Sequence, residues 1–202
     1  MATVRCCGTN PFVALTGLNT VFALASITLG LALPTVVQQY LRGPAWLTAS
    51  VLAGNAVLIA VLSAPIGARL PRYRRTRVII VAAGLWTSWA LGMAVLGPRS
   101  DGVLAAALVA ATLLFTGAEL LHAPVSMGLA AALGPPRLRG RYLATFQYSF
   151  TIASIAAPAL FTTLFAAAPA APWFFLALLT GIGGVGVLLL ERALPERAIQ
   201  PG

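Results

Sequence analysis

Long stretches without Asp, Glu, Lys or Arg constrain this chain more than any other feature. None of these residues occurs between Arg5 and Arg42 or between Arg42 and Arg69, and none occurs from Arg141 up to Glu191. A helix needs about 20 mostly apolar residues to cross the hydrocarbon core of a bilayer, and the first two intervals exceed that length. A single helix over the third interval would reach about 70 Å, more than twice the core thickness, so we expect it to turn back.

The sequence offers a place for that turn and enough apolar segments for six crossings. The turn is expected at AAAPAAPW (166–173), where two prolines separated by small residues remove backbone donors and stop a helix. Two further apolar segments lie between the basic clusters. We therefore expect an all-α membrane protein in which residues 1–202 form a single bundle of six transmembrane helices. These helices are predicted over about 12–38, 45–67, 78–96, 103–133, 142–165 and 173–190.

The composition agrees with a lipid environment. Hydrophobic residues make up 59% of the chain and charged residues only 8%, whereas a soluble domain is about one quarter charged. The net charge of +9 is the balance of thirteen arginines and four acids. The arginines lie in short clusters, without the interleaved aromatic residues of a nucleic-acid surface. We expect the lipid bilayer as a partner and no nucleic acid. The adjacent Cys6 and Cys7 lack the spacing of a disulfide framework or a metal site.

The arginines are distributed unequally between the two sides of the predicted membrane. Eleven fall in segments that six crossings would place on one side, and two fall on the other side. Positively charged loops favour the cytoplasmic side, so we expect a multi-pass protein of the cell membrane with both termini in the cytoplasm. The cytoplasmic set is Arg5, Arg69, Arg72, Arg74, Arg75, Arg77, Arg137, Arg139, Arg141, Arg192 and Arg197, and the opposite set is Arg42 and Arg99.

A carboxyl group and an imidazole are expected deep in the membrane. Glu119 lies near the middle of the fourth predicted helix, where an ionised carboxylate is costly. His122 lies three residues further on the same helix face, close enough to exchange a hydrogen bond or a proton. The two are candidates for proton coupling. Alternatively, Glu119 stays protonated and hydrogen-bonds across the bundle while His122 serves in packing. The candidate partners are Asn55, Gln147 and Tyr148.

Other polar side chains are predicted within the crossings. Residues 147–154, QYSFTIAS, carry amide, phenol and hydroxyl groups on more than one face of the fifth helix. This pattern is typical of a polar cavity wall or of hydrogen bonds between helices, and single hydroxyls can also bond their own helix backbone. The candidate cavity-lining residues are Asn19, Asn55, Gln147, Tyr148 and Thr151.

Small residues predict close helix packing. They recur every four residues between Gly84 and Gly92 in the third helix, and again at Ala153 and Ala157 in the fifth. The glycine-rich segment 180–186 of the sixth helix follows no strand, so close packing is the simpler interpretation than a phosphate-binding loop.

The segment PIGARLPRYRRTRVII (65–80) resembles the basic loop that joins the second and third helices of each half in the major facilitator superfamily. Gly67, Arg72 and Arg75 fit the pattern of that loop. Pro71 stands in place of its acid, and this degeneracy is similar to the C-terminal half of such a transporter.

Three further stretches look like helices of bacterial drug-exporter-like members of that superfamily. Residues 46–70 resemble the eighth helix, residues 117–142 resemble the tenth helix with its following loop, and the fifth predicted helix with Pro158 resembles the eleventh. The resemblance implies alternating access, with a cavity for a small-molecule substrate between two six-helix halves and transport commonly driven by protons.

The chain supplies one such half, so the resemblance also implies a partner. That partner would be a separately encoded second half or, by self-association, an identical subunit; a truncated remnant would have no partner. The expected function is a half or truncated secondary active transporter that carries out proton-coupled efflux, as an antiporter, when assembled. The alternative is a non-transporting membrane scaffold or accessory subunit. We expect no cofactor and no metal, and the lack of a nucleophile context for the single histidine, His122, argues against an intramembrane enzyme.

Overall fold

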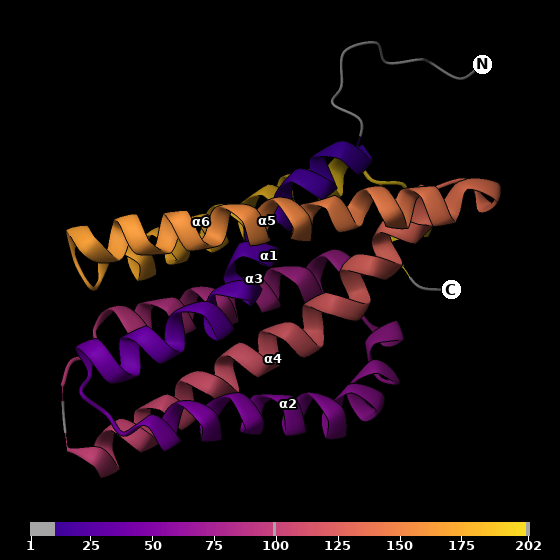
Figure 1. Ribbon diagram of the computed structural model, residues 1–202. Coiled ribbons are helices and arrows are strands. Elements are labelled where there is room, and N and C mark those ends of the chain that lie inside the picture. The colour runs from indigo at the N-terminus through magenta and orange to yellow at the C-terminus, as the bar shows by residue number, and fades with distance from the viewer. Residues whose placement is uncertain (1–10, 99, 201–202) are drawn as a thin grey trace, which may run out of the picture.

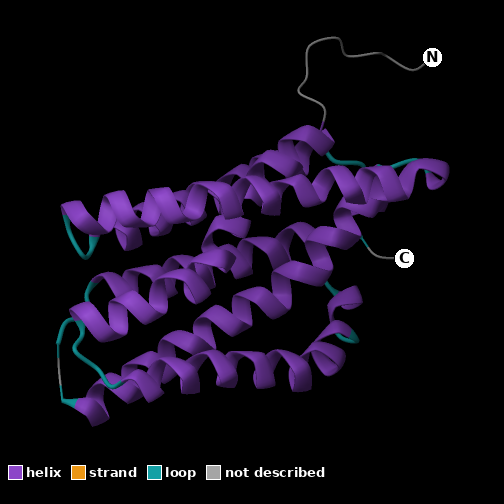
Figure 2. Cartoon of the chain, in the orientation of Figure 1, coloured by secondary structure: helices purple, strands orange, loops and turns teal. Residues whose placement is uncertain are grey.

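The computed structural model describes residues 11–98 and 100–200, and within these ranges the chain forms helices and no strand (Figure 2). Six of the helices are long and apolar enough to cross a membrane. These observations confirm the expected all-α, multi-pass membrane protein. Arg5, Cys6, Cys7 and Arg99 lie outside the described residues.

The observed helices follow the predicted order. Helix α2 has the predicted bounds, and the other ends differ from the prediction by at most three residues when the π turn η1 is counted with α1. Helices α3 and α5 begin three residues early, inside arginine clusters, because arginine favours helix and its long side chain can reach back to the polar interface. The elements are α1 (Pro11–Thr35), η1 (Val36–Tyr40), α2 (Ala45–Gly67), α3 (Arg75–Ala94), α4 (Asp101–Leu133), α5 (Arg139–Ala167) and α6 (Ala171–Leu190).

The turns between helices form where the sequence breaks helical hydrogen bonding. Helix α5 ends at Ala167 and α6 begins at Ala171 with Pro172 in its first turn, so the expected reversal within the charge-free interval is confirmed. In the turn between α1 and α2, Arg42 adopts a left-handed backbone with φ of 56°. Pro44, two residues later, is the N-cap of α2 and has extended backbone geometry.

The helices pack in a defined set of pairs (Figure 1). Helix α3 lies against α6 and α4, α1 lies against α5 and α6, and α2 lies against α4. Helices α2 and α5 bury the smallest share of their residues. They therefore flank the bundle and leave apolar and aromatic side chains exposed. On α2 these include Trp46, Val57 and Val61, and on α5 they include Tyr148, Ile152 and Ile155.

Large aromatic side chains fill the centre of the bundle. The Trp89 ring lies with its centroid 5.5 Å from that of Trp173 and 4.9 Å from that of Phe115, so one indole joins α3, α4 and α6. The Phe22 ring of α1 stacks on Trp86 of α3 at 5.8 Å. Edge-to-face and offset contacts of this kind stabilise helix packing beyond the burial of area.

The prediction of close helix packing at small residues is confirmed in α5 and α6 but not in α3. A Cβ atom on Gly183 would lie 3.0 Å from the Phe22 ring, so close packing of the glycine-rich segment of α6 is confirmed. Ala153 is fully buried in α5 as well. The predicted seam on α3 is wrong for this bundle, because a Cβ on Gly84 or Gly92 would meet no neighbouring atom of the described residues within 4 Å. Spacing alone does not reveal which face of a helix points to its neighbours.

The turns between helices lie at two opposite ends of the bundle (Figure 1). One end carries the α2–α3 and α4–α5 turns and the C-terminal elements η4 (Glu191–Ala193) and α7 (Glu196–Ile199). We call it the arginine-rich end. Its arginines in the described residues are Arg69, Arg72, Arg74, Arg75, Arg77, Arg137, Arg139, Arg141, Arg192 and Arg197.

Candidate functional site

Glu119 is the centre of a polar cluster that joins three helices. The Ser26 hydroxyl of α1 donates a hydrogen bond to Glu119 Oε1 at 2.5 Å, and the Asn55 amide of α2 donates to Glu119 Oε2 at 3.4 Å. Glu119 itself comes from the middle of α4. Within the described residues no basic side chain forms an ion pair with this carboxyl group. Hydrogen bonds therefore stabilise it in place of a counter-charge.

Asn55 is in turn oriented by Thr116. The Thr116 hydroxyl lies 2.6 Å from Asn55 Oδ1 and 2.8 Å from the Thr112 carbonyl of its own helix, so its proton is shared between two acceptors. A donor at Asn55 Oδ1 leaves the Asn55 amide nitrogen to face Glu119. Thr116 and Glu119 are three residues apart and share a face of α4.

His122 does not join this cluster. Its ring is buried between Phe22 and Trp86, with centroid distances of 5.1 Å and 5.0 Å. Within the described part of the chain no hydrogen bond reaches His122, including from Glu119. The i to i+3 spacing thus places both residues on α4, but the two side chains contact different neighbours.

Asn19 also lies outside the Glu119 cluster. It is buried in α1 and donates a hydrogen bond to the Ser149 hydroxyl of α5 at 2.6 Å. The Ser149 hydroxyl in turn donates a hydrogen bond to the Phe146 carbonyl at 2.6 Å. This hydrogen bond joins α1 to α5, and Asn19 lines neither of the two cavities described next.

A cavity of about 440 Å³ lies between α4 and α5. Two of the candidate residues, Gln147 and Thr151, contribute polar groups from α5, and Ser126 contributes a hydroxyl from α4. Tyr148 does not line this cavity and lies on the outer surface of α5, 63% exposed. Ala123, which also lines it, stands one helical turn beyond Glu119 on α4. The remaining lining residues are Met127 and Phe150.

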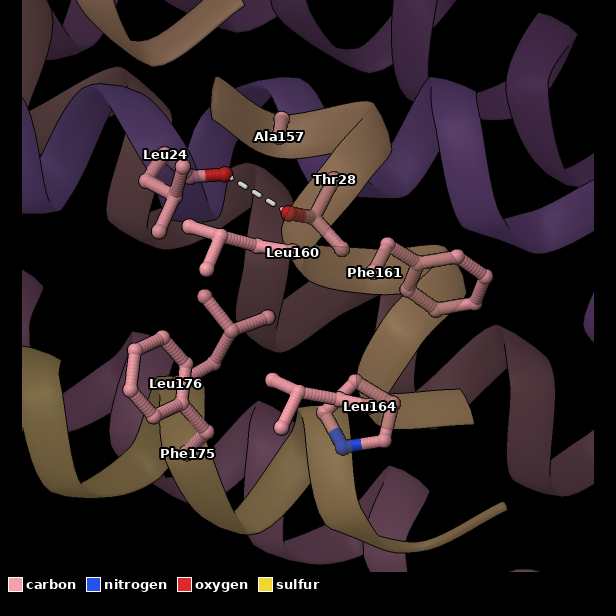
Figure 3. Close-up of a pocket in the computed structure, with 9 residues that line it drawn as sticks. Leu24, Thr28, Ala157, Leu160, Phe161, Leu164, Phe175 and Leu176 are labelled. Atoms are coloured by element: carbon pink, nitrogen blue, oxygen red, sulfur yellow. Dashed lines mark hydrogen bonds between the residues drawn. The ribbon is translucent and has the colours of Figure 1, made fainter. Parts of the chain in front are cut away.

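A second hollow between α1, α5 and α6 is unsuited to a substrate (Figure 3). Its volume is about 10 Å³, the lower limit for a single water molecule. Its one hydroxyl, Thr28, donates to the Leu24 carbonyl at 2.7 Å, as the dashed line in Figure 3 shows. The rest of its lining is apolar, so this hollow is a packing gap.

The three motif residues of the basic loop lie at the arginine-rich end. Gly67 ends α2, Arg72 is exposed in the 3-10 turn η2 (Leu70–Arg72), and Arg75 begins α3. An acid from the C-terminal segment forms ion pairs with arginines of this region. Glu191 pairs with Arg74 at 3.2 Å and with Arg77 at 3.4 Å.

Sequence reasoning missed three partners in these clusters. Ser26 and Glu191 reach their partners across 93 and 117 residues of chain, and no local pattern indicates such contacts. Thr116 had a usable signal, because it precedes Glu119 by three residues and therefore shares its helix face.

The chain matches no protein-family model, and no curated protein or solved structure is significantly similar to it. No group of three His, Cys, Asp or Glu residues that could hold a metal ion occurs in residues 11–98 and 100–200.

Proposed function

We propose that this chain is a six-helix half of a secondary transporter of the major facilitator type, which exports a small molecule in exchange for protons when it assembles with a second half. The observation that carries this proposal is the Glu119 cluster. A carboxyl group in the middle of a membrane helix, without a described basic partner, is a default candidate for a proton-handling role.

The hydrogen bonds around Glu119 are compatible with both of its protonation states. Ionised, the carboxylate accepts from the Ser26 hydroxyl and the Asn55 amide. Protonated, it can donate to Ser26 Oγ, because a hydroxyl can reverse its role from donor to acceptor. Asn55 remains a donor in either case. Glu119 can thus gain and lose a proton without breaking the contacts between α1, α2 and α4, as a coupling group must.

The helix packing supports the relation to a transporter half. Helix α1 packs on α5, and α4 packs on α2; α3 joins α4, and α6 joins α1. If α1, α2 and α3 are exchanged with α4, α5 and α6 in that order, the α1–α5 contact becomes the α4–α2 contact. In the same way, the α3–α4 contact becomes the α6–α1 contact. Such correspondence is expected of the nested 3+3 inverted repeats in each half of these transporters.

A cavity that holds several polar groups, one helical turn from the acid, supports small-molecule transport. The cavity of about 440 Å³ between α4 and α5 has the size of a ligand site and combines the Gln147 amide with two hydroxyls and an aromatic ring. It begins one helical turn from Glu119. We assign it as one wall of the substrate pathway, with the opposite wall supplied by the second half or by an identical subunit.

The arginine-rich end supports a proposal for the orientation in the membrane. Ten described arginines gather there, and such clusters favour the cytoplasmic face. We therefore place both termini in the cytoplasm of a cell-membrane protein. Helices α2 and α5, which leave the most surface uncovered, would meet the second half.

The test is proton-driven export by cells that express the chain with its partner half or at a level that allows self-association. Ethidium, a fluorescent lipophilic cation, serves as the probe, and Glu119→Gln is compared with Asp101→Asn. Both substitutions neutralise a carboxyl group, but Asp101 is exposed at the start of α4. Glu119→Gln should abolish gradient-driven efflux with the protein still folded, and Asp101→Asn should retain it.

Unchanged efflux in Glu119→Gln would contradict proton coupling at this residue. If neither the parent chain nor either variant changed ethidium efflux or the efflux of other lipophilic cations, with or without a second half, the alternative of a non-transporting scaffold or accessory subunit would be favoured. In that case Glu119→Gln should alter only the stability of the bundle.

A further inference from the structure

The arginine-rich end carries more positive charge than its own acids can balance. Ten described arginines lie there, together with Glu191 and Glu196. Glu191 is already shared between Arg74 and Arg77. The first turn of α3 contains no acid, so the positive end of its helix dipole adds to the arginine charge. This surface therefore attracts an external anion.

A cavity opens within this positive surface, between α2, α3 and α4. Its volume is about 140 Å³, whereas a single water needs about 10–15 Å³, so it has room for a compact anionic group. Its one charged lining residue is Arg75, and the other lining residues are apolar or glycine. They are Gly67, Leu70, Pro71, Pro124, Val125 and Gly128.

The position of the Arg75 guanidinium leaves donors available to that cavity. Its Nη1 donates to the Ala198 carbonyl of α7 at 2.9 Å, its one hydrogen bond within the described residues. The guanidinium also lies against Gly128, where a Cβ would be 3.6 Å from Arg75 Nε. A guanidinium has five N–H donors, and its geometry matches phosphate oxygens. Ala198 and Gly128 thus fix the group while most of its donors stay unused.

We propose that this cavity binds the phosphate group of an anionic phospholipid, with Arg75 as the principal contact. The cavity sits at the ends of membrane-crossing helices, the depth at which headgroups lie, and basic pockets between such helices bind anionic headgroups. Leu70 and Val125 supply apolar surface for the glycerol and the first acyl carbons. Arg72, which follows Pro71 in the chain and is exposed, adds positive charge to this end of the bundle. This role is independent of transport by the Glu119 cluster.

The test measures lipid binding to the full-length chain, purified in neutral detergent, by native mass spectrometry. Phosphatidylglycerol is titrated against phosphatidylcholine, and glycerol phosphate serves as the free anion. The parent chain should prefer phosphatidylglycerol to both. Arg75→Gln should weaken phosphatidylglycerol binding about tenfold, since hydrogen bonds to a charged group are lost. Arg137→Gln, an equal change of charge at the exposed α4–α5 turn, should leave it nearly unchanged.

A second variant tests the cavity without changing charge. Gly128→Leu places a side chain in the cavity next to an intact Arg75, and should weaken phosphatidylglycerol binding as well; it also decides the matter if Arg75→Gln does not fold. Equal binding of phosphatidylglycerol and phosphatidylcholine would overturn the proposal, as would equal losses in Arg75→Gln and Arg137→Gln. Glycerol phosphate that bound as tightly as the lipid would overturn the lipid assignment in favour of a free phosphate ester.

Discussion

Glu119 is held by a chain of polar side chains that reaches through three helices. Thr116 orients Asn55, Asn55 and Ser26 donate to the carboxyl group, and each of these partners comes from a helix that also builds the core. The acid is therefore positioned by the fold. His122, one turn away, is positioned by the Phe22 and Trp86 rings and has a separate environment.

Replacing Asn55 tests how much this cluster contributes to the free energy of unfolding. Asn55→Leu should lower the free energy of unfolding by about 0.6 kcal/mol, and by at most about 1.7 kcal/mol, the range measured for hydrogen bonds between membrane helices. Unfolding in mixed micelles with increasing dodecyl sulfate measures the change. Ser154→Ala is the matched control, because the exposed Ser154 hydroxyl donates to the Thr151 carbonyl of its own helix. Equal changes in the two variants would contradict the cluster's role.

At the scale of elements, the sequence predicted the helices well and their facing surfaces poorly. Helix number and approximate bounds follow from charge-free length and proline, which are local properties. The neighbours of each helix depend on contacts between distant residues. The outward position of Gly84 on α3 and the pairing of Ser26 with Glu119 were therefore not predictable from spacing.

The contact between α3 and α6 provides a test of packing. A Cβ on Gly184 would lie 3.1 Å from Ala83 Cβ, so Gly184→Leu should lower the free energy of unfolding by about 1–3 kcal/mol through overpacking. Gly84→Leu is the control, since in the part of the chain that the structure describes no neighbouring atom lies within 4 Å of its Cβ position; its effect should stay within about 0.5 kcal/mol. The same dodecyl sulfate titration measures both. A larger loss in Gly84→Leu than in Gly184→Leu would refute the described α3–α6 contact.

The molecule as a whole presents a single bundle with two sparsely covered flanks, α2 and α5. If a second half or a second copy completes a transport pathway, it should cover these flanks. The sequence predicted the need for a partner through resemblance, and it could not indicate the face involved, because that face depends on which helices the bundle leaves uncovered.

Cross-linking in membranes tests which face meets a partner. In a background where Cys6 and Cys7 are replaced by serine, Val61→Cys on α2 and Val185→Cys on α6 introduce thiols at similarly exposed positions, 65% and 57% exposed. A short bis-maleimide should convert Val61→Cys into a larger cross-linked species and leave Val185→Cys unchanged. A product from Val185→Cys alone would place the interface on the wrong side of the bundle.

The proposed transport requires that the bundle cross the membrane with its arginine-rich end in the cytoplasm. Single cysteines at two exposed positions, Ser100→Cys just before α4 and Gly140→Cys in the first turn of α5, report on opposite ends of the bundle. In intact cells, with Cys6 and Cys7 replaced by serine, a membrane-impermeant maleimide should label Ser100→Cys directly and Gly140→Cys only after permeabilisation. Labelling of Gly140→Cys in intact cells, with Ser100→Cys protected, would contradict this orientation.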